Sequence, residues 1–415
     1  MTKVTLVLLA TITLILVAIV LVIYLAKGYE FNPSTRQFNG TGILVATSDP
    51  NGASVLINGT LKTATNNSLN LQPDNYDITL QLDGYSPWQK TIPIKQEEVF
   101  KTNAFLFPKV PNLTPLTLTG ATNPVLSPDQ SKIVYSVASA SAQKNGLWIL
   151  DMGRSNIPTP LSGSGDFRQI YQDSLGQIAS RAKFLWSPDT KQILAYTGSQ
   201  PEIASSAATP KNGLTYLLNS DQLNSQLLPL TQLQINQTLQ EWQTFSQKRF
   251  LAQMSKLELS LASFLTANTT AISFSPDENK VLYQATASAT LAKIIPSSIP
   301  GTNPTPESRT ISPASLYVYD VKEDKNYEIE NCKLGSEGAR SQIVNCQWFP
   351  SSRHLIAHTA KDISIMEYDG TNKAVIYAGP FVDSIVFSWP NWSKVVILTS
   401  LNAGIGKNLY SINLR

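Results

Sequence analysis

The strongest constraint on the fold is a sequence template that recurs five times between Pro108 and the C-terminus. Each copy has an apolar stretch, a proline, a short polar residue and then a run of β-branched residues. Pro and Asp favour tight turns and β-branched residues favour strands, so each copy predicts two strands joined by a turn. Three copies keep the full motif, and two are looser: Ser127-Pro128-Asp129, Ser187-Pro188-Asp189, Ser275-Pro276-Asp277, Phe349-Pro350-Ser351 and Trp389-Pro390-Asn391.

A further strand-like run follows each copy, which completes three strands of a four-stranded propeller blade. Candidate fourth strands are Pro158–Leu161 and Leu227–Leu230, and Leu116–Thr119 is a candidate to complete the last blade and close the ring. The motifs indicate five blades, or six with a degenerate unit in Ser162–Lys183. The Ser-Pro-Asp repeats resemble those of TolB-like and WD-repeat-like propellers, which implies a mainly β fold with a β-propeller over residues 112–415.

The repeated turn residues have a structural interpretation. Proline fixes one backbone dihedral angle of a turn, and aspartate hydrogen-bonds to nearby backbone N–H groups. We therefore expect these residues to hold local geometry rather than bind a ligand, and they are Pro128, Asp129, Pro188, Asp189, Pro276, Asp277, Pro350 and Pro390. We expect the neighbouring tryptophans Trp186, Trp348 and Trp389 to pack between blades.

A small β domain is predicted over residues 42–108. Ile78, Leu80 and Leu82 alternate with polar residues, as in a strand with one buried face, and the Asn58-Gly59 pair is typical of a tight hairpin turn. The order Pro50-Asn51-Gly52-Ala53, then Asn58-Gly59, then Gly84-Tyr85 resembles the PEGA domain, with Asn51 in place of the family's Glu. The resemblance implies a small β-sandwich-like extracytoplasmic module with no established catalytic residues. We interpret Pro50, Gly52, Ala53 and Gly59 as structural. A PEGA domain followed by a degenerate propeller also resembles uncharacterised PEGA-domain membrane proteins of bacteria.

The N-terminus contains an apolar run, Val4–Ala26, without a charged residue. As a helix it would extend about 34 Å, enough to cross the hydrocarbon core of a membrane. A cleaved signal peptide is the alternative, but its apolar core would be shorter and end in a small-x-small site. We expect residues 1–27 to form a transmembrane signal anchor and 28–41 an irregular stalk. The later domains then lie outside the cytoplasm, with membrane contact through Val4 to Ala26.

Long insertions interrupt the repeats. Residues 233–267 have apolar side chains at helical spacing, which predicts a helical insertion within the propeller. Strands alternate in direction within a blade, so second-to-third loops and fourth-to-first connections emerge on one face. The helical insert and the loops Val137–Gly146, Ser199–Gly213 and Ala287–Pro313 all belong to these two classes. We expect them on a single face that points away from the PEGA domain and serves in recognition.

Composition and motifs exclude several classes of function. A net charge of +3 without a basic run argues against nucleic-acid binding, and two His with two Cys argue against a multi-ligand metal site. His354 and His358 are four residues apart, but on a strand that spacing spans about 13 Å, so we expect no metal ligation. No nucleophile elbow, phosphate-binding glycine loop or His-Glu-x-x-His motif occurs. We predict no catalytic residues, cofactor or metal.

Two functions remain open at this level. The first is a non-enzymatic envelope protein that binds a protein or a cell-wall glycan through the insertion-bearing face. The alternative is a carbohydrate-active hydrolase or lyase with carboxylates in the central channel of the propeller. The predicted first strands of the blades have only Asp383 beside them, which favours binding.

The two cysteines, Cys332 and Cys346, are candidates for a disulfide. An exported protein meets an oxidising environment, and the two positions fall near each other at the start of the fourth repeat.

Overall fold

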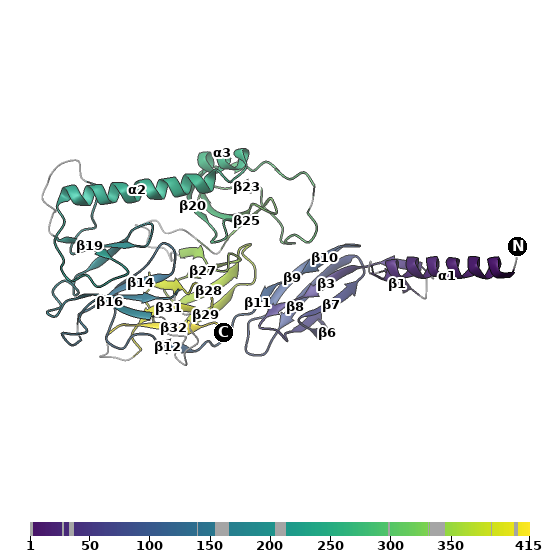
Figure 1. Cartoon of the computed structure of the whole chain (residues 1–415), viewed down its shortest axis with the longest axis horizontal. Coiled ribbons are helices and arrows are strands. Elements are labelled where there is room, and N and C mark those ends of the chain that lie inside the picture. The colour runs from purple at the N-terminus through teal and green to yellow at the C-terminus, as the bar shows by residue number, and fades with distance from the viewer. Residues whose placement is uncertain are drawn as a thin grey trace. The chain divides into compact units, whose positions relative to one another are not determined.

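The computed structural model shows two compact units, residues 1–109 with Lys293–Glu307, and Val110–Ala292 with Ser308–Arg415 (Figure 1). It describes residues 3–26, 29–32, 37–138, 140–153, 166–203, 213–297, 299–330, 332, 345–382, 384–401 and 406–415. Both units are built mainly from short antiparallel strands.

The first unit begins with helix α1 (Lys3–Ala26). Among the described residues, no helix combines the length and the apolar character required to cross a membrane. Strands β1 (Tyr29–Asn32) and β2 (Gln37–Gly40) follow as an antiparallel hairpin. The prediction of an irregular stalk over 28–41 is therefore wrong. Tyr29 and Phe31 alternate with polar residues, a period-two pattern that favours a strand.

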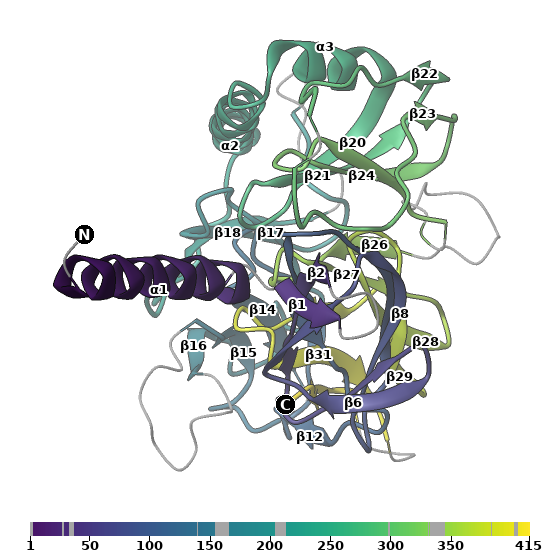
Figure 2. The same ribbon diagram turned by 90° about the vertical axis from the view of Figure 1, so that its right-hand side faces the viewer.

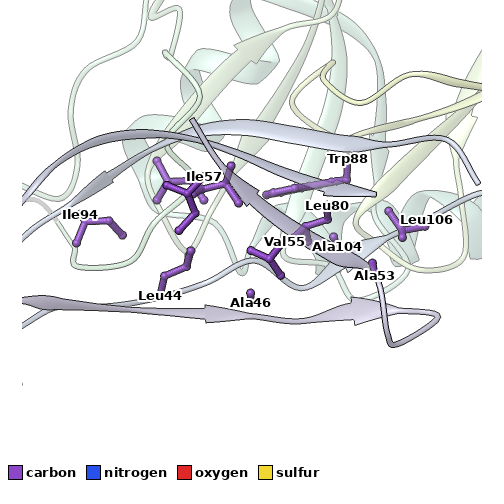
Figure 3. Packing of buried hydrophobic residues seen from close by; sticks show 12 residues of the cluster. Leu44, Ala46, Ala53, Val55, Ile57, Leu80, Trp88, Ile94, Ala104 and Leu106 are labelled. Atoms are coloured by element: carbon purple, nitrogen blue, oxygen red, sulfur yellow. The ribbon is translucent and has the colours of Figure 1, made fainter. Parts of the chain in front are cut away.

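The rest of the first unit has two main sheets around one core. One sheet has the order β6 (Thr60–Ala64), β5 (Ser54–Ile57), β8 (Asp74–Gln81), β9 (Trp88–Ile94). The other has the order β10 (Val99–Lys101), β3 (Gly42–Ala46), β7 (Asn67–Leu71), and the short strands β4 (Ser48–Asp49) and β11 (Ala104–Phe105) pair beside them. Leu44 from β3 belongs to one hydrophobic cluster with Val55, Leu80 and Trp88 from the larger sheet, and all four are at most 3% exposed (Figure 3). The two sheets thus form the expected sandwich-like domain.

The motif residues of this domain occupy turns and the edge of its core. Asn58 and Gly59 have φ angles of 49° and 76°, the pair of positive values that a tight hairpin turn between β5 and β6 requires. Gly52 has φ of 80°, a backbone conformation that residues with a Cβ atom rarely adopt. Ala53 next to it is fully buried. The Ala53 N–H donates to Thr65 Oγ1 at 2.9 Å.

In its described residues, the second unit has five antiparallel sheets of three or four strands, which pair in chain order except where β12 completes the last sheet beside β32. The first three are β13 (Thr122–Leu126), β14 (Lys132–Val137), β15 (Gly146–Asp151), β16 (Asp166–Gln172); β17 (Lys183–Trp186), β18 (Gln192–Tyr196), β19 (Thr215–Asn219); and β20 (Thr269–Phe274), β21 (Lys280–Ala285), β24 (Leu316–Asp320), β25 (Lys325–Glu328). The last two are β26 (Asn345–Trp348), β27 (His354–His358), β28 (Asp362–Glu367), β29 (Ala374–Ala378); and β30 (Val386–Ser388), β31 (Lys394–Thr399), β32 (Asn408–Asn413), β12 (Leu113–Pro115). This is the blade pattern of a β-propeller.

Tryptophans join neighbouring blades as expected. Trp186 Nε1 donates to the Val125 carbonyl of the preceding blade at 3.0 Å, and Trp348 Nε1 donates to the Ser273 carbonyl at 3.0 Å. Trp389 is 2% exposed and packs in a cluster that combines residues of the first and last blades. The indoles of Trp186 and Trp348 thus fill the space between two sheets while their N–H groups are satisfied.

The edge strands differ from the sequence prediction at three places. The ring closes through β12 at Leu113–Pro115, which pairs with β32, rather than through Leu116–Thr119. The fourth strand of the first blade is β16, within the stretch considered for a sixth unit, while Pro158–Leu161 lies outside the described residues. Leu227–Leu230 is not a strand: Leu230 N donates to the Thr215 carbonyl of β19, but Pro229 has no N–H to continue the ladder.

The helical insertion is two helices, α2 (Gln232–Met254) and α3 (Leu259–Asn268). Thr231 caps α2 through a reciprocal capping box with Gln234. The hairpin β22 (Ala289–Thr290) and β23 (Thr310–Ile311) lies within the long loop of the third blade.

Candidate interaction surface

Each full Ser-Pro-Asp turn is a closed hydrogen-bonded clamp between the first and second strands of a blade. Ser127 Oγ donates to Asp129 Oδ1 at 2.6 Å and accepts from the Lys132 N–H at 2.9 Å. The same two contacts measure 2.7 and 2.8 Å in the second blade, and 2.6 and 3.0 Å in the third. The residue after the aspartate has positive φ in every case: Gln130, Thr190 and Glu278.

The two looser turns keep the backbone shape with other side chains. Ser352 and Trp392 each have φ of 59°, and Asn391 Oδ1 accepts from the Ser393 N–H at 3.1 Å as the aspartates do. In the fourth blade Ser351 Oγ lies 2.8 Å from His354 Nδ1. The repeated prolines and aspartates therefore shape turns.

The clamp lowers the pKa of all three aspartates below the ordinary value of 3.8. Burial raises the pKa of Asp129, but hydrogen bonds from Ser127, Ser131 and Thr190 outweigh it. For Asp189 the hydrogen bond from Ser187 is the main cause. For Asp277 burial is again outweighed, by hydrogen bonds from Asn279 and Ser275.

The strand order defines two faces of the propeller. The turn face has the first-to-second and third-to-fourth connections, including the Ser-Pro-Asp turns. The loop face has the second-to-third loops and the connections from one blade to the next. Exposed large apolar side chains within the described blade connections gather on the loop face: Leu118, Leu175, Ile203, Leu214, Leu233 and Leu401, from 45% to 83% exposed. The described turn-face connections contribute Leu223, 60% exposed, and Leu259, 78% exposed beyond the end of α2. Between the two faces, the chain also exposes Leu228 ahead of α2 and Phe245, Phe250 and Leu251 within it.

Three of these residues belong to one corner of the second blade. Gln232 Nε2 donates to the Glu202 carbonyl at 3.3 Å, which brings Leu233 and Ile203 to the same place. The bond from Leu230 N to the Thr215 carbonyl, 2.8 Å long, brings the chain just before α2 beside Leu214. An apolar cluster exposed to water is a common mark of a partner-binding surface. Sequence alone offered only a weak signal for it, namely leucines and isoleucines within turn-rich connections.

The insertions are not confined to one face. α2 starts at the loop face, but near its far end Gln253 Nε2 donates to Glu278 Oε1 at 2.9 Å and Lys256 forms an ion pair with Glu278. Glu278 belongs to a Ser-Pro-Asp turn, so the helix crosses from the loop face to the turn face. The expectation of a single elaborated face is therefore wrong for the helical insert. Lys293–Glu307, within the long loop of the third blade, belongs to the first unit.

The first strands of the blades offer little for acid–base chemistry. β13, β17, β20, β26 and β30 contain one charged residue, Lys183, and no carboxylate. Asp383 lies outside the described residues. His354 and His358 are both buried, and rings of Phe349 and Phe381 lie edge-on to them. The described part of the chain contains no group of three His, Cys, Asp or Glu side chains able to hold a metal ion.

Cys332 and Cys346 are joined by a disulfide, with 5.6 Å between their Cα atoms. Both are buried in the cluster between the third and fourth blades, beside Trp348 and Tyr327.

Comparison with known proteins agrees with the sequence resemblance. A search of curated proteins finds no match to this chain. Similar solved structures include a putative TolB from Agrobacterium tumefaciens (11% identity, 70% of each chain, TM-score 0.19) and TolB from Acinetobacter baumannii (13%, 87% of this chain and 63% of that one, 0.23). An oligogalacturonate lyase from Vibrio parahaemolyticus is also similar (7%, 82% and 86%, 0.25). At these TM-scores the account of the fold rests on the strand pairing. Residues 41–109 match the PEGA domain, the family indicated by the Pro50–Ala53 motif.

Proposed function

We propose that this chain is a membrane-anchored extracytoplasmic protein of the cell envelope that binds a partner through the loop face of a five-bladed propeller. The partner is a protein or a cell-wall glycan, and the chain has no enzymatic activity of its own. The observation that carries the proposal is the gathering of exposed apolar side chains on the loop face, opposite a turn face made of polar clamps.

The N-terminal helix supports the anchoring part of the proposal. Every described side chain of α1, from Val7 to Ile23, is exposed, and apart from Thr11 and Thr13 they are apolar. The two threonine hydroxyls donate back to helix carbonyls, Thr13 to Leu9 at 2.8 Å and Thr11 to Leu8 at 2.9 Å. Although the described residues contain no helix long and apolar enough to cross a membrane, a helix surface that is apolar all round is stabilised by an apolar environment, and lipid provides one without a protein partner.

The absence of carboxylates from the described first strands supports binding over chemistry. Glycoside hydrolysis needs a pair of carboxyl groups on either side of the scissile bond. A hydrolase or lyase working in the central channel would draw such groups from the inner strands, and their described residues supply none.

A capture experiment tests the proposal. The fragment Gly40–Arg415 is immobilised and exposed to solubilised native envelope, and retained proteins and glycans are identified. The double variant Leu214→Ser and Leu233→Ser should retain at least tenfold less of the specific partner, because polar substitution removes apolar contact area.

The matched control is Leu259→Ser. Leu259 is also strongly exposed, at 78%, but it lies just after the end of α2 that contacts Glu278 on the turn face. Equal capture by the double variant and the parent fragment, with both folded, would show that the loop face is not the binding surface. Loss of capture in the control alone would move the site to the turn face.

A further inference from the structure

The middle of α2 is exposed on every side. Each residue from Gln243 to Ala252 is exposed, including Phe245 at 48%, Phe250 at 37% and Leu251 at 56%. The helix is held at its ends, by buried Ile235 and by Met254 with the contacts to Glu278. Figures 1 and 2 show it at the outside of the second unit. A ten-residue helical stretch that does not pack on a hydrophobic core is only marginally stable in water unless another surface packs on it.

One face of this stretch is a continuous stripe. Gln237, Glu241, Phe245 and Lys248 recur every three or four residues, so they lie above one another on the helix. These four line, with Gln240 and Thr244, an open hollow of 410 Å³. At 3.6 residues per turn the stripe points away from Ile235 and Met254, the residues that attach α2 to the propeller.

We propose that this outward stripe of α2 pairs antiparallel with the same stripe of a second copy of the chain. The argument is charge complementarity. Around a two-fold axis between Thr244 and Phe245, Glu241 of each chain faces Lys248 of the other, so the interface contains two such pairs of opposite charge. Arg249 then faces the neutral Gln240, so no like charges meet.

The same charges exclude the parallel arrangement. Parallel helices in register bring Glu241 opposite Glu241 and Lys248 opposite Lys248, and like charges across an interface are destabilising. In a two-fold dimer the same surface of both copies forms the interface, so it must be self-complementary. Here the ring of Phe245 from each copy would enter the hollow that Phe245 lines on the other copy. The stripe is separate from the apolar corner of the loop face, so this inference goes beyond the proposed function and does not depend on it.

Charge swapping in the full chain tests the pairing. Thr244→Cys, next to the two-fold axis, serves as a reporter, and mild oxidation should join two chains through it. The native cysteines are bonded to each other and leave no competing thiol among the described residues. Ser246→Cys is the matched control, because Ser246 is also exposed but lies on another side of the helix.

The expected result has three parts. Thr244→Cys should cross-link at least tenfold faster than Ser246→Cys. Adding Glu241→Lys should slow the reaction about tenfold, since two pairs of like charges then face each other. Adding Lys248→Glu as well should restore the original rate, because the reversed pairs attract again.

Circular dichroism and melting temperature confirm that each variant is folded. Equal cross-linking at Thr244 and Ser246, or no rescue by the double charge reversal, would overturn the pairing. Cross-links from Thr244 to a different protein would overturn it too. Capture of the envelope partner by the Gly40–Arg415 fragment does not depend on whether α2 pairs with a second copy. A failed cross-linking test is therefore distinguishable from failure of the proposed function.

Discussion

At the residue scale, the Ser-Pro-Asp turns show how far a motif can be interpreted without a structure. The prediction that Pro and Asp are structural rested on turn chemistry alone, and Asp129 Oδ1 does accept from the Ser131 N–H at 3.0 Å. The part of the Ser127 hydroxyl, which donates to Asp129 and accepts from Lys132 N–H, was not predicted. What the sequence could not reveal is which leucines lie exposed. Leu118 and Leu401 look like any other apolar residues in a β-rich chain, because exposure depends on tertiary neighbours.

The clamps predict a specific pH dependence of stability. Since the folded-state pKa values of Asp129, Asp189 and Asp277 are lowered, their carboxylates stabilise the fold fully above the ordinary pKa of 3.8. This contribution is lost as the pH falls through the lowered values. The triple Asp→Asn variant should melt several degrees below the parent at pH 7, and the difference should shrink below pH 3.8. Thermal melts across pH measure it, and a constant difference would contradict the clamp account.

At the element scale, strands with clear alternation were predictable and strands with defects were not. β16 pairs with β15 through a register shift between Leu147 and Trp148, so its apolar residues Phe167, Ile170 and Tyr171 do not alternate. A bulge hides the period-two signal. The helical insert was predicted, but the break between α2 and α3 was not. The irregularity in apolar spacing near Phe245 falls inside α2, where there is no buried face to keep the spacing regular.

The two helices of the insert should differ in their effect on stability. Leu265 of α3 is fully buried, whereas Phe245 of α2 is 48% exposed. Leu265→Ala should lower the free energy of unfolding by about 2–5 kcal/mol through lost burial and a cavity. At protein concentrations low enough to keep the fragment monomeric, Phe245→Ala should leave it nearly unchanged. Denaturant titration of the Gly40–Arg415 fragment compares them, and similar losses in both variants would mean that α2 is packed in solution.

The disulfide should add measurable stability to the fourth blade. Cys332 and Cys346 are 14 positions apart, and closing a loop of this length contributes about 3 kcal/mol in the chain-entropy model. The Cys332→Ser, Cys346→Ser variant should therefore melt lower than the parent under non-reducing conditions and match it in reductant. Two thiols that react with an alkylating agent in the native, unreduced protein would argue against the bond.

At the scale of the whole molecule, the order of parts was predictable because each has a distinct periodicity: an apolar run, short alternating strands, then a long repeat. The ring closure by β12 was harder, since Leu113–Pro115 is a short strand whose partner β32 lies almost 300 residues away. Pairing over such a distance leaves no local signal.

The proposed membrane anchor makes a prediction about location. Alkaline phosphatase fused after Arg415 should be active in bacterial cells, because that enzyme needs an oxidising compartment. β-Galactosidase fused at the same point should be inactive. The fragment that begins at Gly40 should be soluble. Recovery of that fragment only with membranes, or the opposite reporter pattern, would contradict a single exporting anchor.

The most direct test of loop-face binding is site-specific photo-cross-linking of the full chain in intact cells. A photoreactive residue is placed at Leu401 on the loop face or at Leu223 on the turn face, positions that are 49% and 60% exposed. We predict that Leu401 cross-links to a distinct envelope component and that Leu223 gives only background. Strong adducts from Leu223 with none from Leu401 would contradict the account.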